Sequence, residues 1–139
     1  MRYAIGELAR AANTKVQTIR WYEQKGLMPC PERTQGGQRR YDEAALRRLK
    51  FIRHGRELGF VLTDIAALLS LQDDPRAPCR KAHEIAESQL ADIRGKIARL
   101  QALEKELQNM LCPRPDGTSA TCKVIEVLAN HALCLHGRH

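Results

Sequence analysis

Apolar and polar residues alternate at the spacing of two short helices near the start of the chain. Apolar side chains recur at helical spacing over residues 5–12, and Asn13 and Thr14 then interrupt the pattern. A second periodic segment covers residues 16–25 and ends at Gly26, since glycine enters the left-handed backbone region without steric cost. The pattern predicts a helix, a tight turn and a second helix.

A stretch rich in proline and glycine separates these helices from a longer one. Residues 29–41 carry a Gly-Gly pair between extended residues, which indicates a small hairpin or wing with a basic return strand. Asp42 is then a plausible N-cap for an amphipathic and strongly basic helix over residues 43–58. We therefore expect a wing followed by a helix that is apolar on one side.

Two breaks follow the basic helix. Gly59 interrupts the periodicity, and Thr63 is the expected cap of a short apolar helix that runs through Leu71. The run 73–75 contains two aspartates and a proline, which mark the boundary to a different element.

A long uninterrupted helix is predicted from Cys79 to Leu111, because no proline occurs in this stretch. Apolar residues follow at alternating spacings of three and four around one polar position, Glu104: they are Leu90, Ile93, Ile97, Leu100, Leu107 and Leu111. This heptad row fits a helix packed on its own domain, but a rod of about 50 Å outreaches a small core. Pairing with a second chain is the favoured interpretation.

The predicted fold is therefore mainly α-helical. An N-terminal winged helix-turn-helix occupies residues 1–75, and a long dimerisation helix that forms an antiparallel coiled coil occupies residues 76–111. Residues 112–139 hold a loop with Pro and Gly, a helical turn or two over 124–129, and a tail rich in His and Cys.

Composition narrows the function classes. The chain has 139 residues, which bounds it to one modest core. It has no apolar run of the ~20 residues that a membrane span needs and no signal-peptide core, so we expect a cytoplasmic protein without a membrane partner. We find no paired carboxylates in a plausible cleft, no nucleophile with a base and no phosphate-binding glycine loop, so an enzyme is not expected.

The net charge of +7 is confined to the first part of the chain. Residues 1–60 carry 13 Lys and Arg against 6 Asp and Glu, whereas residues 61–139 carry 10 of each. Clustered basic residues have affinity for phosphates regardless of sequence, although a solvated basic surface would show the same count. The distribution favours double-stranded DNA as partner of the N-terminal part.

The second short helix is the expected recognition helix. In a helix-turn-helix, short polar side chains and arginine on the second helix reach base edges and phosphates in the major groove. A basic wing adds backbone contacts that fix register. The candidate DNA-contacting residues are Val16, Gln17, Thr18, Arg20 and Tyr22 of the helix and Arg39, Arg40 and Tyr41 of the wing, although aromatic residues such as Trp21 and Tyr22 are more often core residues than base-stacking ones.

Cysteines suggest metal binding. A disulfide framework is not expected in a reducing compartment, and thiolates select soft ions. Cys79 and Cys112 stand at opposite ends of the predicted rod, too far apart in one chain to share an ion. In an antiparallel dimer, Cys79 of one chain meets Cys112 and Cys122 of the other, which gives two equivalent sites. Ordinary buried thiols are the alternative.

Further donors lie near these cysteines. His83 follows Cys79 by one helical turn, and the tail carries a mixed cluster of His131, Cys134, His136 and His139. A lone histidine such as His83 is more often a surface residue than a ligand. Mixed Cys and His tracts bind metal but are weak signals, so a second metal site and an unstructured tail are equally open for residues 131–139. Cys30 is remote from all of them and is treated as incidental.

The motifs taken together resemble the MerR family of regulators over nearly the whole chain. The resemblance rests on residues 5–9 (IGELA), 18–27 (TIRWYEQKGL), 39–41 (RRY), 51–53 (FIR) and 57–60 (ELGF). Trp21 stands where the family commonly has tyrosine or phenylalanine. The resemblance implies a homodimer that untwists and bends promoter DNA on binding an effector, so that RNA polymerase engages both promoter elements.

The resemblance also bears on the effector. Residues 111–128 look like the family's metal-binding loop and its following helix, and Cys79 stands where divalent-ion sensors have cysteine and copper sensors have serine. It implies a divalent ion: zinc, cadmium, lead or mercury. The exact cysteine spacings leave the choice among these ions open.

Other regulators remain as alternatives. A redox-responsive or organic-ligand-responsive regulator on the same scaffold would use the same DNA-binding residues 1–75, although an iron–sulfur cluster usually needs four closely spaced cysteines. A structural zinc protein would bind metal without any effect on transcription. The response of transcription to metal separates these possibilities.

Overall fold

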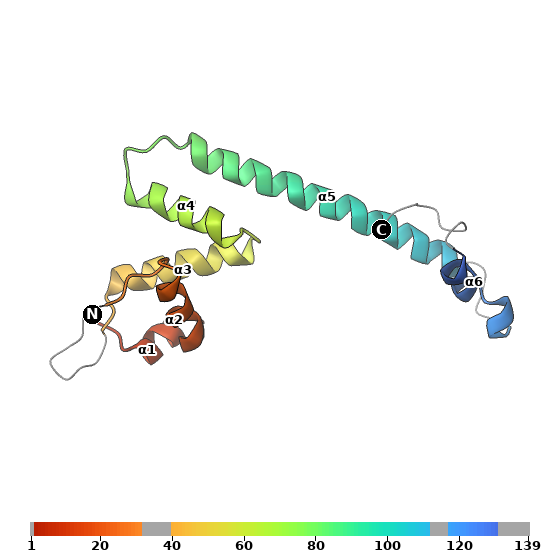
Figure 1. Cartoon of the computed structure of the whole chain (residues 1–139), viewed down its shortest axis with the longest axis horizontal. Helices are drawn as coiled ribbons and strands as arrows, with labels where there is room; N and C mark the ends of the chain where they lie inside the picture. The colour runs from red at the N-terminus through yellow and green to blue at the C-terminus, as the bar shows by residue number, and fades with distance from the viewer. Residues whose placement is uncertain (1, 32–39, 112–116, 131–139) are drawn as a thin grey trace. The chain divides into compact units, whose positions relative to one another are not determined.

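The computed structural model describes residues 2–31, 40–111 and 117–130, and the helices in these ranges are shown in Figure 1. In chain order they are α1 (Ile5–Ala11), α2 (Val16–Gln24), α3 (Glu43–Glu57), α4 (Leu62–Asp73), α5 (Arg80–Leu111), the 3-10 turn η1 (Ser119–Thr121) and α6 (Lys123–Ala129). The chain forms two compact units, residues 1–85 and 86–139, with the boundary inside α5. The expectation of a mainly helical chain is confirmed.

The helix–turn–helix at the start of the chain is present as predicted. Asn13 takes a positive φ of 51° between α1 and α2, and the amide of Thr14 donates to the Ala9 carbonyl over 2.8 Å. Asparagine tolerates this left-handed conformation better than most residues. Gly26 has a φ of 77° just after α2, which confirms it as the residue where the chain turns away from the helix.

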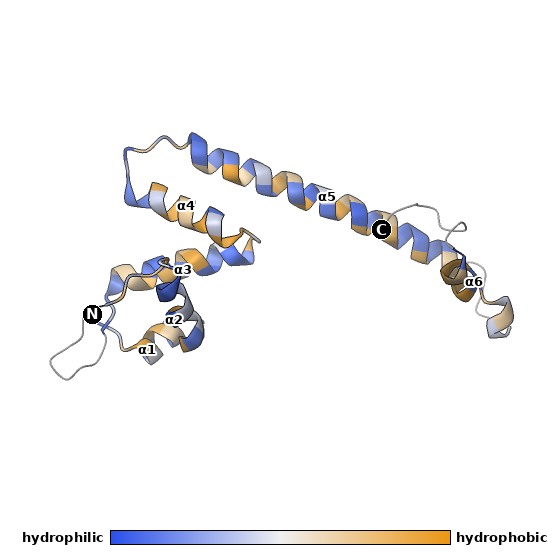
Figure 2. Cartoon of the chain, viewed as in Figure 1, coloured by the Kyte–Doolittle hydropathy of each residue, from blue (hydrophilic) through white to orange (hydrophobic). Residues whose placement is uncertain are grey.

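The core of the first unit is built from the apolar sides of α1 to α4. Its fully buried large side chains are Leu8, Ile19, Met28, Tyr41, Leu49, Ile52, Ile65 and Leu69. Figure 2 shows apolar residues along one side of α3 and polar residues along the rest. Gly55 lets α3 approach α4, because a Cβ atom there would lie 3.0 Å from the Ile65 side chain.

The ends of α3 and α4 test two of the predicted caps. The Asp42 carboxylate accepts a hydrogen bond from the Ala45 amide over 2.9 Å, which confirms Asp42 as the N-cap of α3. The prediction for Thr63 is wrong: α4 begins at Leu62, Val61 is the capping residue, and no side chain caps it. The chain turns at Gly59, which has a φ of 85°, and the next helix then begins before Thr63, the polar residue that the sequence suggested as its cap.

One arginine ties three segments of the first unit together. The Arg48 Nε donates to the Leu27 carbonyl over 2.7 Å, just beyond α2. Its Nη1 also pairs with the Asp73 carboxylate over 3.2 Å, at the last residue of α4. The Arg48 side chain is three-quarters buried, whereas that of Asp73 is 60% exposed, so the hydrogen bond to Leu27 is the more shielded of the two contacts.

The predicted wing lies mostly at residues 32–39, outside the described residues. Its end is fixed by an antiparallel bridge, in which the Tyr3 amide donates to the Tyr41 carbonyl over 2.6 Å and the Tyr41 amide donates back over 2.8 Å. The Tyr3 hydroxyl also donates to the Glu43 carboxylate over 2.8 Å. The start of the chain is therefore attached to the segment that enters α3.

The long helix α5 has 32 residues, in agreement with the uninterrupted helix predicted from the absence of proline. At 1.5 Å per residue it is about 48 Å long. In the second unit, Met110 of α5 and Val127 of α6 are buried, whereas every residue from 91 to 100 is exposed. α6 begins one residue before the predicted helical segment.

Candidate DNA-binding face and metal-binding cysteines

The predicted recognition residues of α2 differ in how exposed their side chains are. Gln17 and Arg20 are exposed, and Thr18 is half-buried. Val16 is also half-buried and packs against the core of the first unit. Lys15, which precedes α2 and is exposed, adds a positive charge at this end of the helix. The polar side chains that a major groove would meet are thus Gln17, Thr18 and Arg20.

Tyr22 and Tyr41 occupy the core instead of the surface. Their exposed fractions are 7% and 1%, which leaves little side-chain area for contact with DNA. The Tyr41 hydroxyl donates to the Glu23 carboxylate, so it holds α2 in place. The Cys30 thiol donates to the same carboxylate over 3.4 Å.

The sequence pattern did not distinguish Trp21 from Tyr22. Trp21 is 41% exposed, and the Lys25 ammonium lies 5.6 Å from the centre of its ring. Neighbouring residues on a helix point about 100° apart, so only one of the two aromatic side chains can face the core. The spacing of three residues between Ile19 and Tyr22 puts both on the same side of α2, and that side is buried. This spacing could have identified Tyr22 as the core residue.

The basic residues predicted for the wing are only partly described. The Arg40 guanidinium lies 3.6 Å from the Glu7 carboxylate, and both side chains are partly exposed. Arg39 lies outside the described residues. The ion pair connects the end of the wing to α1.

Two of the three predicted metal ligands lie in the described residues. The Cys79 thiol is exposed immediately before α5, and the Cys122 thiol is half-buried immediately before α6. Cys112 lies outside the described residues. Among residues 2–31, 40–111 and 117–130 of one chain, no three His, Cys, Asp or Glu side chains converge. The accessible thiol of Cys79 suits a soft divalent ion.

The further candidate donors are divided in the same way. His83 is exposed on the first turn of α5, whereas His131, Cys134, His136 and His139 lie outside the described residues. Cys30 is exposed in the first unit and its thiol donates to the Glu23 carboxylate.

Among the helices of the described residues, none has the length and apolar character that a membrane span requires.

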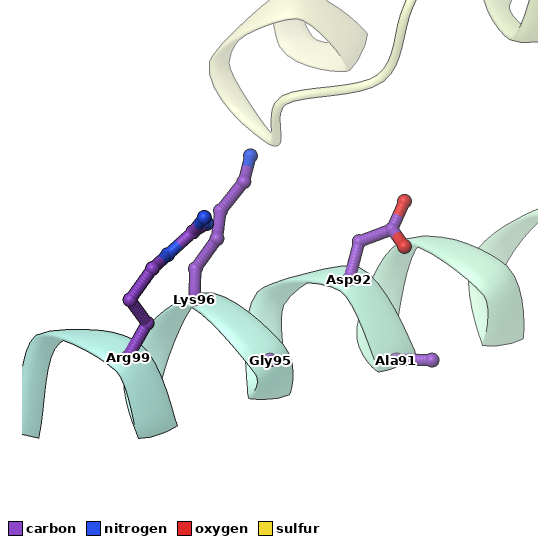
Figure 3. A pocket seen from close by; sticks show the side chains of 5 residues that line it. All are labelled: Ala91, Asp92, Gly95, Lys96 and Arg99. Carbon is purple, nitrogen blue, oxygen red and sulfur yellow. The ribbon is translucent and has the colours of Figure 1, made fainter. Parts of the chain in front are cut away.

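The polar flank of α5 is shown in Figure 3. Asp92, Lys96 and Arg99 project from one side of the helix, and Ala91 points elsewhere. With Gly95 they line a shallow hollow. The side chains around this hollow are charged and exposed, in contrast to the apolar row of the same helix.

Comparisons with known proteins agree with this architecture. The family description "MerR HTH family regulatory protein" matches residues 3–72, and "MerR, DNA binding" matches residues 46–110. The HTH-type transcriptional regulator ZntR of Escherichia coli (strain K12) is 41% identical over 133 residues, which cover 94% of each chain. The mercuric resistance operon regulatory protein of Bacillus cereus is 38% identical over 129 residues, which cover 92% of this chain and 98% of the relative.

Solved structures give the same result. The transcription regulator PbrR691 from Ralstonia metallidurans CH34 in complex with lead(II) is 39% identical, with a TM-score of 0.78 and coverage of 91% of this chain and 98% of that one. MerR from Bacillus megaterium MB1 in complex with mercury(II) is 30% identical, with a TM-score of 0.67 and coverage of 93% and 99%. The chain therefore belongs to the MerR family of helix-turn-helix transcription regulators, which are not enzymes.

Proposed function

We propose that this protein is a homodimeric transcription activator that responds to a divalent thiophilic ion, namely zinc, cadmium, lead or mercury. One observation carries the proposal: α5 exposes an apolar row with a single polar position, Glu104, and has a cysteine directly before its first residue. Sequence places a second cysteine, Cys112, directly after its last residue. The lead and mercury complexes of similar regulators support an ion of this class.

The apolar row of α5 is the proposed dimer interface. Its exposed fractions are 46% for Leu90, 37% for Ile93, 48% for Ile97, 65% for Leu100, 59% for Leu107 and 71% for Leu111. A second α5 would cover this row in coiled-coil fashion. Antiparallel pairing centred near residue 95 puts Leu90 opposite Leu100, and Ile93 opposite Ile97, of the other chain. These contacts are between apolar side chains, whereas the one polar position, Glu104, comes opposite Ala86.

The same antiparallel register brings the cysteines together. The start of one α5 lies beside the end of the other, so Cys79 of one chain comes near Cys112 and Cys122 of its partner. Three thiolates bind a soft ion tightly and must lose their protons to do so. Symmetry gives two such sites in a dimer.

The first unit, residues 1–85, is the proposed DNA-binding element and is called the head below. We propose that Gln17 and Arg20 reach base edges from α2 and that Thr18 and Arg40 contact the DNA backbone, together with Arg39, which lies outside the described residues. Tyr22 and Tyr41 support α2 from the core. A similar regulator, HiNmlR, has been solved bound to promoter DNA at 25% identity and a TM-score of 0.55. We propose that the dimer distorts such DNA so that RNA polymerase engages it.

The test is transcription in vitro from the cognate promoter in reducing buffer, with zinc, cadmium, lead and mercury titrated separately. We expect one or a few ions to activate the wild type, and Cys112→Ser and Cys122→Ser to abolish activation while promoter binding is retained. Cys30→Ser is the matched control and should activate normally. If the wild type binds the promoter and no ion activates it, the effector is redox or organic and the metal proposal fails.

A further inference from the structure

The first turn of α5 carries an exposed nitrogen donor beside the exposed thiol of Cys79. The His83 amide donates to the Cys79 carbonyl over 3.1 Å, so helical hydrogen bonding already includes Cys79. Residues four apart on a helix lie on the same side, with Cβ atoms about 5–6 Å apart. Cys79 directly precedes α5 and His83 lies on its first turn, so the thiol and the imidazole are one helical turn apart, a spacing at which both can bind one ion.

This pair lies on the row that the second chain is proposed to cover. Counted back from Leu90, the alternating spacings of four and three reach Ala86, His83 and Cys79 in turn. Ile85, two residues beyond His83 and about 200° around the helix, is buried with an exposed fraction of 6%. The turn thus packs through its Ile85 side and leaves the side with Cys79 and His83 open.

An imidazole on an apolar row needs a polar partner once the row is covered. In the proposed register, His83 comes opposite Leu107 of the partner subunit, which offers no hydrogen bond. Burial of a polar group without a partner is unfavourable, because the group loses its hydrogen bonds to water. Within the described ranges, no side-chain hydrogen bond or ion pair of His83 or Cys79 is found. Coordination of the ion bound by Cys79 would satisfy the imidazole.

We propose that His83 is a further metal ligand, which acts with Cys79 and so completes a four-donor site. The inference rests on the proposed function, since it adds one nitrogen to three thiolates. A Cys₃His set is a common tetrahedral site for zinc, whereas mercury needs only soft sulfur donors. His83 therefore makes the site selective for borderline ions such as zinc.

The experiment compares full-length wild type with His83→Ala by competition titration against a chromophoric chelator, with zinc and mercury measured separately. We expect His83→Ala to weaken zinc binding at least about tenfold and to change mercury binding by less than about twofold. The matched control is His54→Ala, because His54 is an exposed histidine on α3 in a basic environment without a neighbouring thiol. It should bind both ions as the wild type does.

The visible spectrum of the cobalt(II)-loaded protein gives a second readout. The wild type should show the strong bands of a tetrahedral site, and the bands should shift in His83→Ala and be retained with more sulfur character in His83→Cys. Equal zinc affinity and an identical cobalt spectrum in His83→Ala would overturn the assignment. If Cys122→Ser also binds zinc like the wild type, the cysteine site itself is wrong, which separates the two failures.

Discussion

Replacement of Ile97 by aspartate tests the proposed dimer interface most directly. Ile97 lies in the exposed apolar row of α5 and is 48% exposed in a single chain. Burial of a whole isoleucine side chain is worth about 1.5–3 kcal/mol, so the exposed half contributes about 1 kcal/mol for each chain and about 2 kcal/mol for the dimer. The Ile97→Asp variant loses this contribution.

The carboxylate adds a second cost. A charge left unpaired in an interface costs about 3–5 kcal/mol, so the total is about 5 kcal/mol or more. Since each 1.4 kcal/mol changes an equilibrium constant tenfold, the dissociation constant of the dimer should rise by about three orders of magnitude. Ile97→Ala, which loses only apolar area, should raise it by about thirtyfold.

The assay is sedimentation equilibrium of the metal-free protein in reducing buffer over a range of concentrations. The control is Ala98→Asp, because Ala98 is the next residue on the helix, is exposed, and lies off the apolar row. We expect Ala98→Asp to dimerise as the wild type does. An equal dissociation constant for Ile97→Asp and Ala98→Asp, or a monomeric wild type, would refute pairing through this row.

Three further predictions concern the two units separately. Arg20→Ala should weaken promoter binding by about 1–3 kcal/mol at matched salt and leave metal affinity unchanged, which filter binding and a metal titration together would check. Gly95→Ala should stabilise α5 by about 1 kcal/mol in thermal unfolding, whereas Gly55→Ala should show no such gain, because its added methyl group meets a core side chain at 3.0 Å. The hydrogen bond to Glu43 raises the pKa of Tyr3 above its ordinary value, so its stabilisation is complete below about pH 10 and is lost as the pH rises further. Urea unfolding should therefore show a smaller alkaline loss for Tyr3→Phe than for the wild type, and parallel curves would contradict this.

Periodicity predicted the helices well because α1 to α4 each bury a single face and α5 keeps its apolar residues in a single row. The segment from Cys79 to Leu111 is the clearest case, since a heptad row without proline fits no other structure. Asp42 and Gly26 were also predictable, because capping and left-handed turns depend on the chemistry of one residue.

Features that depend on tertiary contacts were not predictable in the same way. Thr63 carried the polar signal of a cap, but the turn at Gly59 and the burial of Ile65 fix the start of α4 at Leu62. Tyr41 looked like part of a DNA-contacting wing, yet its bridge to Tyr3 places it in the core. Among the described residues of one chain no three such donors converge, so the cysteine site stays a prediction that rests on a second chain.

The contacts of Arg48 bear on how a signal would travel through the head. One guanidinium contacts both the carbonyl just beyond α2 and the carboxylate that ends α4, so these two points cannot move far apart without breaking at least one of the two interactions. A torque applied at Asp73, where the chain leaves for the long helix, therefore turns the recognition helix with the rest of the head as one rigid lever. Bending would then occur in the connecting residues 74–79, and the length and stiffness of this segment would set how far the N-terminal unit rotates.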